Sequence, residues 1–96
     1  MNPNYCDKEI QELLIQSGFP IKQISELHFY FTPTLYDAQM WLIEQGIRIA
    51  AIPIPHSNKW HYYSDCLENN NLQEFNTYQE ALSFGIKESL KQWNRI

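Results

Sequence analysis

The pattern of residues 33–66 predicts an amphipathic helix followed directly by a β-hairpin, and this local order constrains the fold more than any other feature of the chain. Thr34 is a typical helix cap, and Gly46 is typical of a helix end. Residues 47–54 are almost all apolar, which predicts a strand covered on both faces, and residues 60–66 alternate in polarity like a returning strand. This region therefore predicts a helix and two antiparallel strands.

A second helix is predicted near the N-terminus. Asn4 can cap it, with Asp7 three residues further on, and Gly18 follows its last turn. The apolar positions between them recur at helical spacing, and they are Ile10, Leu13 and Leu14.

A third helix is predicted from residue 78 onward. Thr77 and Glu80 have the spacing of a capping box, in which each side chain accepts a hydrogen bond from an unpaired amide. Ala81, Gly85 and Ser89 form a ridge of small residues at four-residue intervals. Such a ridge favours close packing of this helix on the domain's own sheet, and the alternative is a contact with another chain.

One more strand completes the predicted fold. Residues 23–32 alternate between apolar and polar side chains, as a half-buried strand does, and residues 67–76 have no such period and predict a loop. The expected order is therefore α-β-α-β-β-α. We predict a single α+β domain over residues 1–96, with a three-stranded sheet, a C-terminal β-hairpin and helices packed on one face.

Composition narrows the possible functions. Hydrophobic residues make up 44% of the 96 residues, so a packed core is expected. The formal net charge is −4, whereas nucleic-acid binders neutralise phosphates with clustered cations. Lys87, Lys91 and Arg95 form one loose basic group at the end of the last helix, where cations are favoured without any ligand. Nucleic acid is therefore an unlikely partner, and no apolar run is long enough for a membrane span.

The two cysteines indicate a reducing compartment. Cys6 and Cys66 are far apart, no CxxC motif is present, and residues 1–4 lack the features of a signal peptide. We expect reduced thiols in a cytoplasmic protein, and a Cys6–Cys66 disulfide remains open as the alternative.

No pattern indicates a catalytic or metal centre. The histidines His28, His56 and His61 lack the close spacing of zinc ligands, so no metal is expected. His61 could act with Asp65 or Cys66, or His28 with Cys66, but no neighbouring group in the sequence would activate the thiol. No motif for a cofactor or a small-molecule ligand is found.

Aromatic residues on the strands suggest a binding surface instead. Two predicted strands supply them, and the candidate interaction surface consists of Tyr30, Trp60, His61, Tyr62 and Tyr63. These rings could complete the core, contact a second copy or another protein, or stack on bases. The acidic balance of the chain argues against bases.

The sequence resembles a group of short uncharacterised proteins encoded by gut Bacteroidetes and by their phages and mobile elements. The resemblance lies in Pro33-Thr34-Leu35, Ala38, Trp41-Leu42, Ile47, Ile49, Trp60, Tyr62-Tyr63, Tyr78, Glu80-Ala81-Leu82, Gly85-Ile86 and Leu90. It covers about residues 4 to 93 and implies a small cytosolic accessory protein, often a dimer, with no assigned activity and no catalytic residues to transfer.

These observations predict a non-enzymatic interaction protein that acts through an exposed sheet face or a strand edge, by self-association or by binding another protein. A nucleic-acid-associated module of phage or mobile-element origin is the second hypothesis. A small enzyme that uses His61 with Asp65 or Cys66 is the third.

Overall fold

A computed structural model of the chain describes residues 4–20, 23–24, 29–30, 32–67 and 73–94. In chain order the elements are α1 (Lys8–Ser17), β1 (Gln23–Ile24), β2 (Phe29–Tyr30), α2 (Leu35–Glu44), β3 (Ile49–Pro53), β4 (Trp60–Ser64) and α3 (Tyr78–Trp93). The protein is α+β, and its described strands form two separate antiparallel pairs. The predicted order α-β-α-β-β-α was wrong, because a strand pair stands where one strand was expected.

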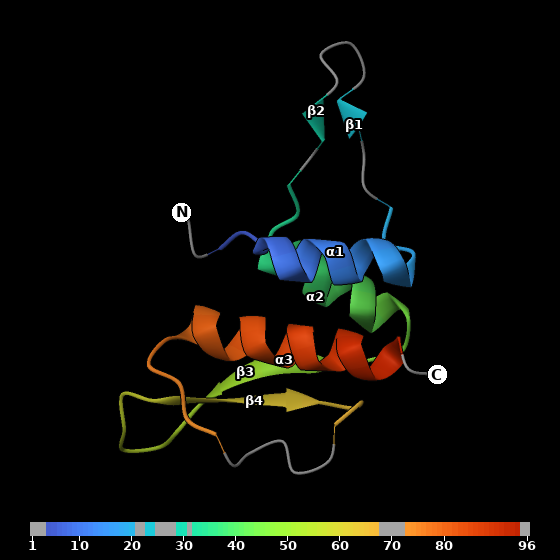
Figure 1. The fold of residues 1–96 in the computed structure, drawn as a ribbon. Helices are drawn as coiled ribbons and strands as arrows, with labels where there is room; N and C mark the ends of the chain where they lie inside the picture. The colour runs from blue at the N-terminus through green and yellow to red at the C-terminus, as the bar shows by residue number, and fades with distance from the viewer. Residues whose placement is uncertain (1–3, 21–22, 25–28, 31, 68–72, 95–96) are drawn as a thin grey trace.

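The predicted three-stranded sheet was also wrong. Strands β1 and β2 do not pair with the later hairpin: Gln23 pairs with Tyr30, and β3 pairs with β4. Figure 1 shows β1 and β2 beyond α1, on the opposite side of the molecule from β3 and β4. Alternating polarity predicts a strand but not its partner, and closing a short local hairpin costs less entropy than pairing across the domain.

Local hydrogen bonds set the start of each helix. Asp7, not Asn4, caps α1, and its Oδ1 accepts from the Ile10 amide at 2.8 Å. The chain before Asp7 is extended along the approach to α2: the Cys6 amide donates to the Pro33 carbonyl at 3.0 Å, and the Leu35 amide donates to the Asn4 carbonyl at 2.8 Å. That pairing keeps Asn4 outside the helix.

The cap of α2 is a complete capping box. The Asp37 amide donates to Thr34 Oγ1 at 3.0 Å, and the Thr34 amide donates to Asp37 Oδ2 at 2.9 Å. In α3 the Thr77 hydroxyl accepts a hydrogen bond from the Glu80 amide at 3.1 Å. This is one of the two bonds of the predicted capping box, and it is the one found among the described residues. The predicted caps at Thr34 and Thr77 are therefore confirmed.

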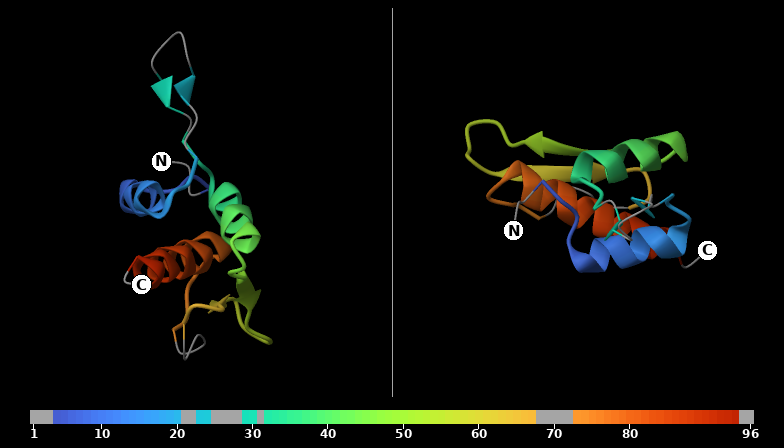
Figure 2. Two further views of the ribbon diagram at one scale, coloured as in Figure 1. Left: turned by 90° about the vertical axis from the view of Figure 1, so that its right-hand side faces the viewer. Right: turned by 90° about the horizontal axis from the view of Figure 1, so that it is seen from above.

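Helix α3 lies in the middle of the molecule. It contacts both strands of the β3–β4 sheet on one side and both α1 and α2 on the other (Figures 1 and 2). Helix α3 covers both strands of the sheet, α2 contacts β3, and α1 packs on α3 in a second layer. The buried core between these layers includes Ile10, Leu14, Leu42, Ile49, Leu82, Ile86 and Leu90.

The three helices run in the same direction. Near their N-terminal ends, Gln79 Nε2 donates to Asn4 Oδ1 at 3.2 Å, and near their C-terminal ends the Ser17 hydroxyl donates to Asn94 Oδ1 at 3.0 Å. Trp41 and Trp93 stack at the C-terminal ends of α2 and α3, with ring centroids 5.2 Å apart. Figure 2 shows the same parallel arrangement from above.

The small-residue ridge of α3 packs on the protein's own sheet, as predicted. A β-carbon on Gly85 would lie 3.2 Å from the Tyr62 Cβ, and the buried hydroxyls of Ser89 and Ser64 share a hydrogen bond of 2.5 Å. Without side chains at this point, α3 can approach β4 more closely than a helix of larger residues could. This contact fixes which face of the sheet points inward.

Candidate functional site

Alternate residues of β4 point to opposite faces of the sheet. Tyr62 and Ser64 point inward to α3, where they meet Gly85 and Ser89. The residues between them therefore point outward, because successive side chains of a strand alternate. Consistent with this, Tyr63 is 37% exposed whereas Tyr62 is 9% exposed.

Two rings of the predicted interaction surface pack within the protein. Trp60 makes an edge-to-face contact with Tyr78 at a centroid distance of 5.5 Å. Tyr62 packs against Phe75 and Phe84, with centroids at 6.1 and 5.4 Å. The Tyr62 ring is therefore unavailable to a partner. It completes the core, which was one of the three uses considered for these rings.

A third residue of the predicted surface lies elsewhere. Tyr30 is on β2, in the other strand pair, so the structure does not bring it onto one sheet with β4. His28, which was considered as a partner for Cys66, lies outside the described residues. Of the predicted set, His61 and Tyr63 share the outer face of β4.

Strand β3 completes this outer face. Ala50 lies opposite Tyr63 in the strand register, and Ile52 lies opposite His61. Ile52 is 44% exposed, and no described helix lies on this side of the sheet. We call the four residues Ala50, Ile52, His61 and Tyr63 the outer sheet face.

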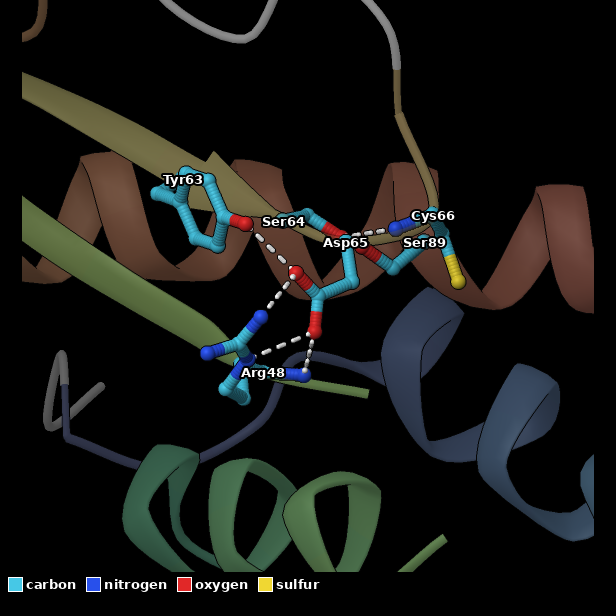
Figure 3. Close-up of polar contacts among 6 residues, drawn as sticks. All are labelled: Arg48, Tyr63, Ser64, Asp65, Cys66 and Ser89. Carbon is cyan, nitrogen blue, oxygen red and sulfur yellow. Dashed lines mark hydrogen bonds and ion pairs between the residues drawn. The ribbon is translucent and has the colours of Figure 1, made fainter. Parts of the chain in front are cut away.

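A charged cluster closes one end of the outer sheet face (Figure 3). Arg48 Nε donates to Asp65 Oδ2 at 2.9 Å and Arg48 Nη2 donates to Asp65 Oδ1 at 3.4 Å, while the Arg48 amide also donates to Oδ2 at 3.0 Å. The Tyr63 phenol donates to Asp65 Oδ1 at 2.5 Å. These bonds lower the pKa of Asp65 to about 2, and the bond to Asp65 raises the pKa of Tyr63.

This cluster separates Asp65 from His61. Four residues of extended strand span about 13 Å, which is too far for a direct hydrogen bond. The Asp65 oxygens bind Arg48 and Tyr63, whereas His61 Nδ1 lies 3.3 Å from the Gln73 carbonyl oxygen. The hypothesised pairing of His61 with Asp65 is therefore not made in this structure.

The thiols are free and poorly activated. Burial, followed by the charge of Asp65, raises the pKa of Cys66, and burial with the charges of Asp7 and Asp37 raises the pKa of Cys6 to about 12. A thiolate is the reactive form of cysteine, so both environments suppress nucleophilic attack. In the described part of the chain, no group of His, Cys, Asp or Glu could hold a metal ion.

The outer edge of β3 is a feature that sequence reasoning did not locate, although a strand edge was one of the predicted binding surfaces. The Asp65 amide donates to the Arg48 carbonyl, and the Ile54 amide donates to the Lys59 carbonyl. Antiparallel hydrogen bonds recur at every second residue, so the even-numbered residues of this strand bond to β4. The backbone groups of Ile49, Ala51 and Pro53 therefore point away from β4. Ile49 is only 2% exposed, so the free edge consists of Ala51 and Pro53.

Few groups on this edge have a partner. Gln39 Nε2 of α2 donates to the Ile49 carbonyl at 2.7 Å, and Pro53 has no N–H. Among the described residues, the N–H of Ile49, both backbone groups of Ala51 and the C=O of Pro53 have no hydrogen-bond partner. The far edge of β4 differs, because Trp60 pairs with Phe75 there through bonds of 2.8 and 2.9 Å.

A shallow pocket of about 220 Å³ lies where α2 and α3 begin. Its lining residues are Asn4, Thr34, Leu35, Tyr36, Tyr78 and Leu82. None of them is charged, and the volume is below the roughly 300–1,000 Å³ of typical ligand pockets. The pocket therefore supports a binding role less well than the β3–β4 sheet does.

No protein-family model, curated protein or solved structure matches the chain. The resemblance to short proteins of gut Bacteroidetes and their mobile elements therefore stays a prediction. Within the described residues, no helix has the length and apolar character needed to cross a membrane.

Proposed function

We propose that the protein is a small cytoplasmic, non-enzymatic interaction protein, which binds another protein chain through the outer sheet face and the free edge of β3. The observation that carries this proposal is the position of Ile52: it is 44% exposed and adjoins an edge whose Ala51 amide and carbonyl are unpaired among the described residues. The two free thiols support a reducing compartment.

The composition of the β3 edge supports this use. Natural sheet edges are normally protected against pairing by charged side chains, bulges or a covering element. Residues 49–54 contain no charged side chain, and Pro53 is the one residue in β3 itself that would limit pairing. An extended partner strand could gain affinity from main-chain hydrogen bonds and specificity from contacts with Ile52 and Tyr63.

The nucleic-acid hypothesis has weaker support. Lys87 Nζ lies 3.3 Å from Glu9 Oε2, and Lys91 Nζ lies 3.4 Å from Glu9 Oε1. These two cations are thus partly neutralised by α1, and the chain as a whole carries a formal charge of −4. Binding to mixed DNA and RNA at low ionic strength, lost as salt is added, would be needed to favour it.

Selection from a random peptide library on the immobilised protein tests the proposal. We expect the selected peptides to be extended, with apolar residues at alternate positions, and to shift the amide NMR signals of Ala51 and Ile52. Ile52→Lys should abolish their binding. Ile15→Lys is the matched control, because Ile15 is 59% exposed but lies on α1, on the far side of α3 from the sheet.

Two results would contradict the proposed function. One is peptide binding that Ile52→Lys leaves unchanged. The other is the failure of any peptide to be selected by a protein that also remains a monomer at high concentration.

A further inference from the structure

We propose that Gln39 of α2 guards the edge of β3, so that the edge accepts only a short extended segment of a partner chain, paired with Ala51. The guard closes the edge at Ile49, and Pro53 limits pairing at the other end of the strand. This inference rests on the proposed function, since it defines the kind of partner that fits the same edge and names a residue that selects it.

The guard is a single side chain. Gln39 Nε2 donates to the Ile49 carbonyl oxygen at 2.7 Å and so connects α2 to β3. Ile49 is 2% exposed, although β3 is an edge strand of its sheet. A partner strand at this position would have to displace the Gln39 side chain, because the carbonyl that the partner needs is already bonded.

The backbone groups of Ile49 would otherwise extend the edge. They point away from β4, as those of Ala51 do, because the directions of these groups alternate along a strand. The Ile49 amide has no hydrogen-bond partner among the described residues, and the Ile49 carbonyl has Gln39. Without Gln39, the edge would therefore offer one more complete donor and acceptor pair, two residues before Ala51.

The other end of the edge is limited by proline and by a turn. Pro53 has no N–H and contributes only its carbonyl. The turn follows at once, because the Ile54 amide donates to the Lys59 carbonyl at 3.0 Å. The groups that stay open are the N–H and C=O of Ala51 and the C=O of Pro53. They lie toward the arrowhead end of β3, which extends past the start of α2 (Figure 1).

So short an edge determines the kind of partner. Each main-chain hydrogen bond contributes little net free energy, so these few bonds cannot hold a partner of any sequence. Side-chain contacts must supply the rest, and Ile52 is the exposed apolar residue next to Ala51. A partner residue opposite Ile52 would lie beside it on the outer sheet face. The partner that fits is an extended segment of about three residues with an apolar side chain at that position.

A neutral amide suits the position of the guard. Natural sheet edges are protected by charged side chains or by a covering element, and residues 49–54 carry no charge. A charged side chain in place of Gln39 would lose hydration beside a residue that is 2% exposed. The glutamine bonds the Ile49 carbonyl without that cost, and the cover by α2 takes the place of a charge on the strand.

The variant Gln39→Ala tests the guard, and Gln11→Ala is the matched control. Gln11 Nε2 donates to the Cys6 carbonyl at 2.9 Å, so the control loses the same kind of bond outside the sheet. Peptides are selected from one random library on wild type and on each variant. We expect Gln39→Ala to bind its peptides about tenfold more tightly than wild type binds its own, because Ile49 adds two main-chain bonds.

NMR shows where the peptide pairs. The amide signal of Ile49 should shift on peptide binding in Gln39→Ala, and in neither wild type nor Gln11→Ala. Circular dichroism verifies that each variant is folded. If Gln39→Ala is unfolded, Gln39→Met replaces it, because methionine keeps the length of the side chain and removes the donor; the Ile49 signal should then shift in that variant.

The outcomes separate this inference from the proposed function. If wild type binds peptides and Gln39→Ala binds them no more tightly, the guard is excluded and the proposed function stands. A gain in affinity that leaves the Ile49 signal unmoved, or that Gln11→Ala reproduces, also overturns the guard. If only Gln39→Ala binds peptides, Gln39 is confirmed as the guard and the proposed function fails for wild type. If no protein binds a peptide, both fail.

Discussion

Gly85 and Tyr62 are packed so closely that a β-carbon added to Gly85 would lie 3.2 Å from the Cβ of Tyr62. The contact is made by the Cβ atom of Tyr62, which can move only if the backbone of β4 moves with it. The ring beyond it is held by Phe75 and Phe84. This contact therefore sets the spacing between α3 and the sheet.

Enlarging residue 85 should destabilise the protein. Alanine would gain about 1 kcal/mol of helix propensity over glycine, whereas overpacking costs about 1–3 kcal/mol. We expect Gly85→Ala to lower the free energy of unfolding by about 1 kcal/mol and Gly85→Leu by about 3 kcal/mol, measured by urea denaturation. Gln92→Ala, at an exposed position of α3, is the control. A Gly85→Ala protein more stable than wild type would show that the sheet can yield at this point.

The buried hydroxyl pair of Ser64 and Ser89 should show energetic coupling. Their oxygens lie 2.5 Å apart, and the two residues are 1% and 0% exposed. In a double-mutant cycle of Ser64→Ala and Ser89→Ala, we expect a coupling free energy of about 1 kcal/mol. The combined variant should thus lose less stability than the sum of the single variants, and strict additivity would contradict the interaction.

Asp65 should make stability depend on pH in the acid range. Its pKa is about 2 in the folded protein, below the value of about 3.9 in an unfolded chain. A lowered folded pKa stabilises the protein above the unfolded pKa, and this contribution is lost as the pH falls from about 4 to about 2. We expect Asp65→Asn to have a lower Tm than wild type at pH 7 and the difference to vanish near pH 2.

Salt provides the control for this prediction. Arg48 is 76% exposed in its side chain, so the ion pair should weaken as ionic strength rises. Glu12→Gln, an exposed carboxylate on α1, should not reproduce the pH-dependent difference. A gap in Tm between wild type and Asp65→Asn that stays constant down to pH 2 would exclude the Asp65 contribution.

The two cysteines should differ in reactivity. With a pKa of about 12, the Cys6 thiol has a thiolate fraction of about one in ten thousand at pH 8. It is also 2% exposed and donates to the Thr34 carbonyl at 3.4 Å. We expect a disulfide reagent to modify Cys66 slowly and Cys6 only after denaturation. The Cys66→Ser variant isolates Cys6, and rapid labelling of that folded variant would contradict the prediction.

The helices could be predicted because their signals are local. Thr34 and Asp37 are three residues apart and satisfy one another, so the start of α2 is determined within one turn. The cap of α1 was assigned to the wrong residue because Asn4 and Asp7 are both suitable cap residues. The choice between them depends on the backbone pairing of residues 4–6 with residues 33–35, which no local pattern reveals.

The candidate site could be predicted only in part. Alternation along residues 60–64 places Trp60 with Tyr62 on one face and His61 with Tyr63 on the other, but it does not tell which pair faces the core. That choice depends on the match between Tyr62 and the small-residue ridge of α3. The free edge of β3 depends on hydrogen-bond register, and its one sequence signal was Pro53, whose missing N–H suits a position facing away from the ladder.

The central place of α3 has a consequence for how the chain becomes a folded protein. Both other helices and both strands of the main sheet have α3 as their common neighbour, and the Ser17–Asn94 contact joins residues 77 positions apart. Contacts of such long range close slowly because a large loop must be ordered first. During synthesis, the core residues of α1 and α2 therefore stay exposed until α3, their common packing partner, has been made. A chain cut short before residue 78 would present those residues to the machinery that removes unfolded proteins.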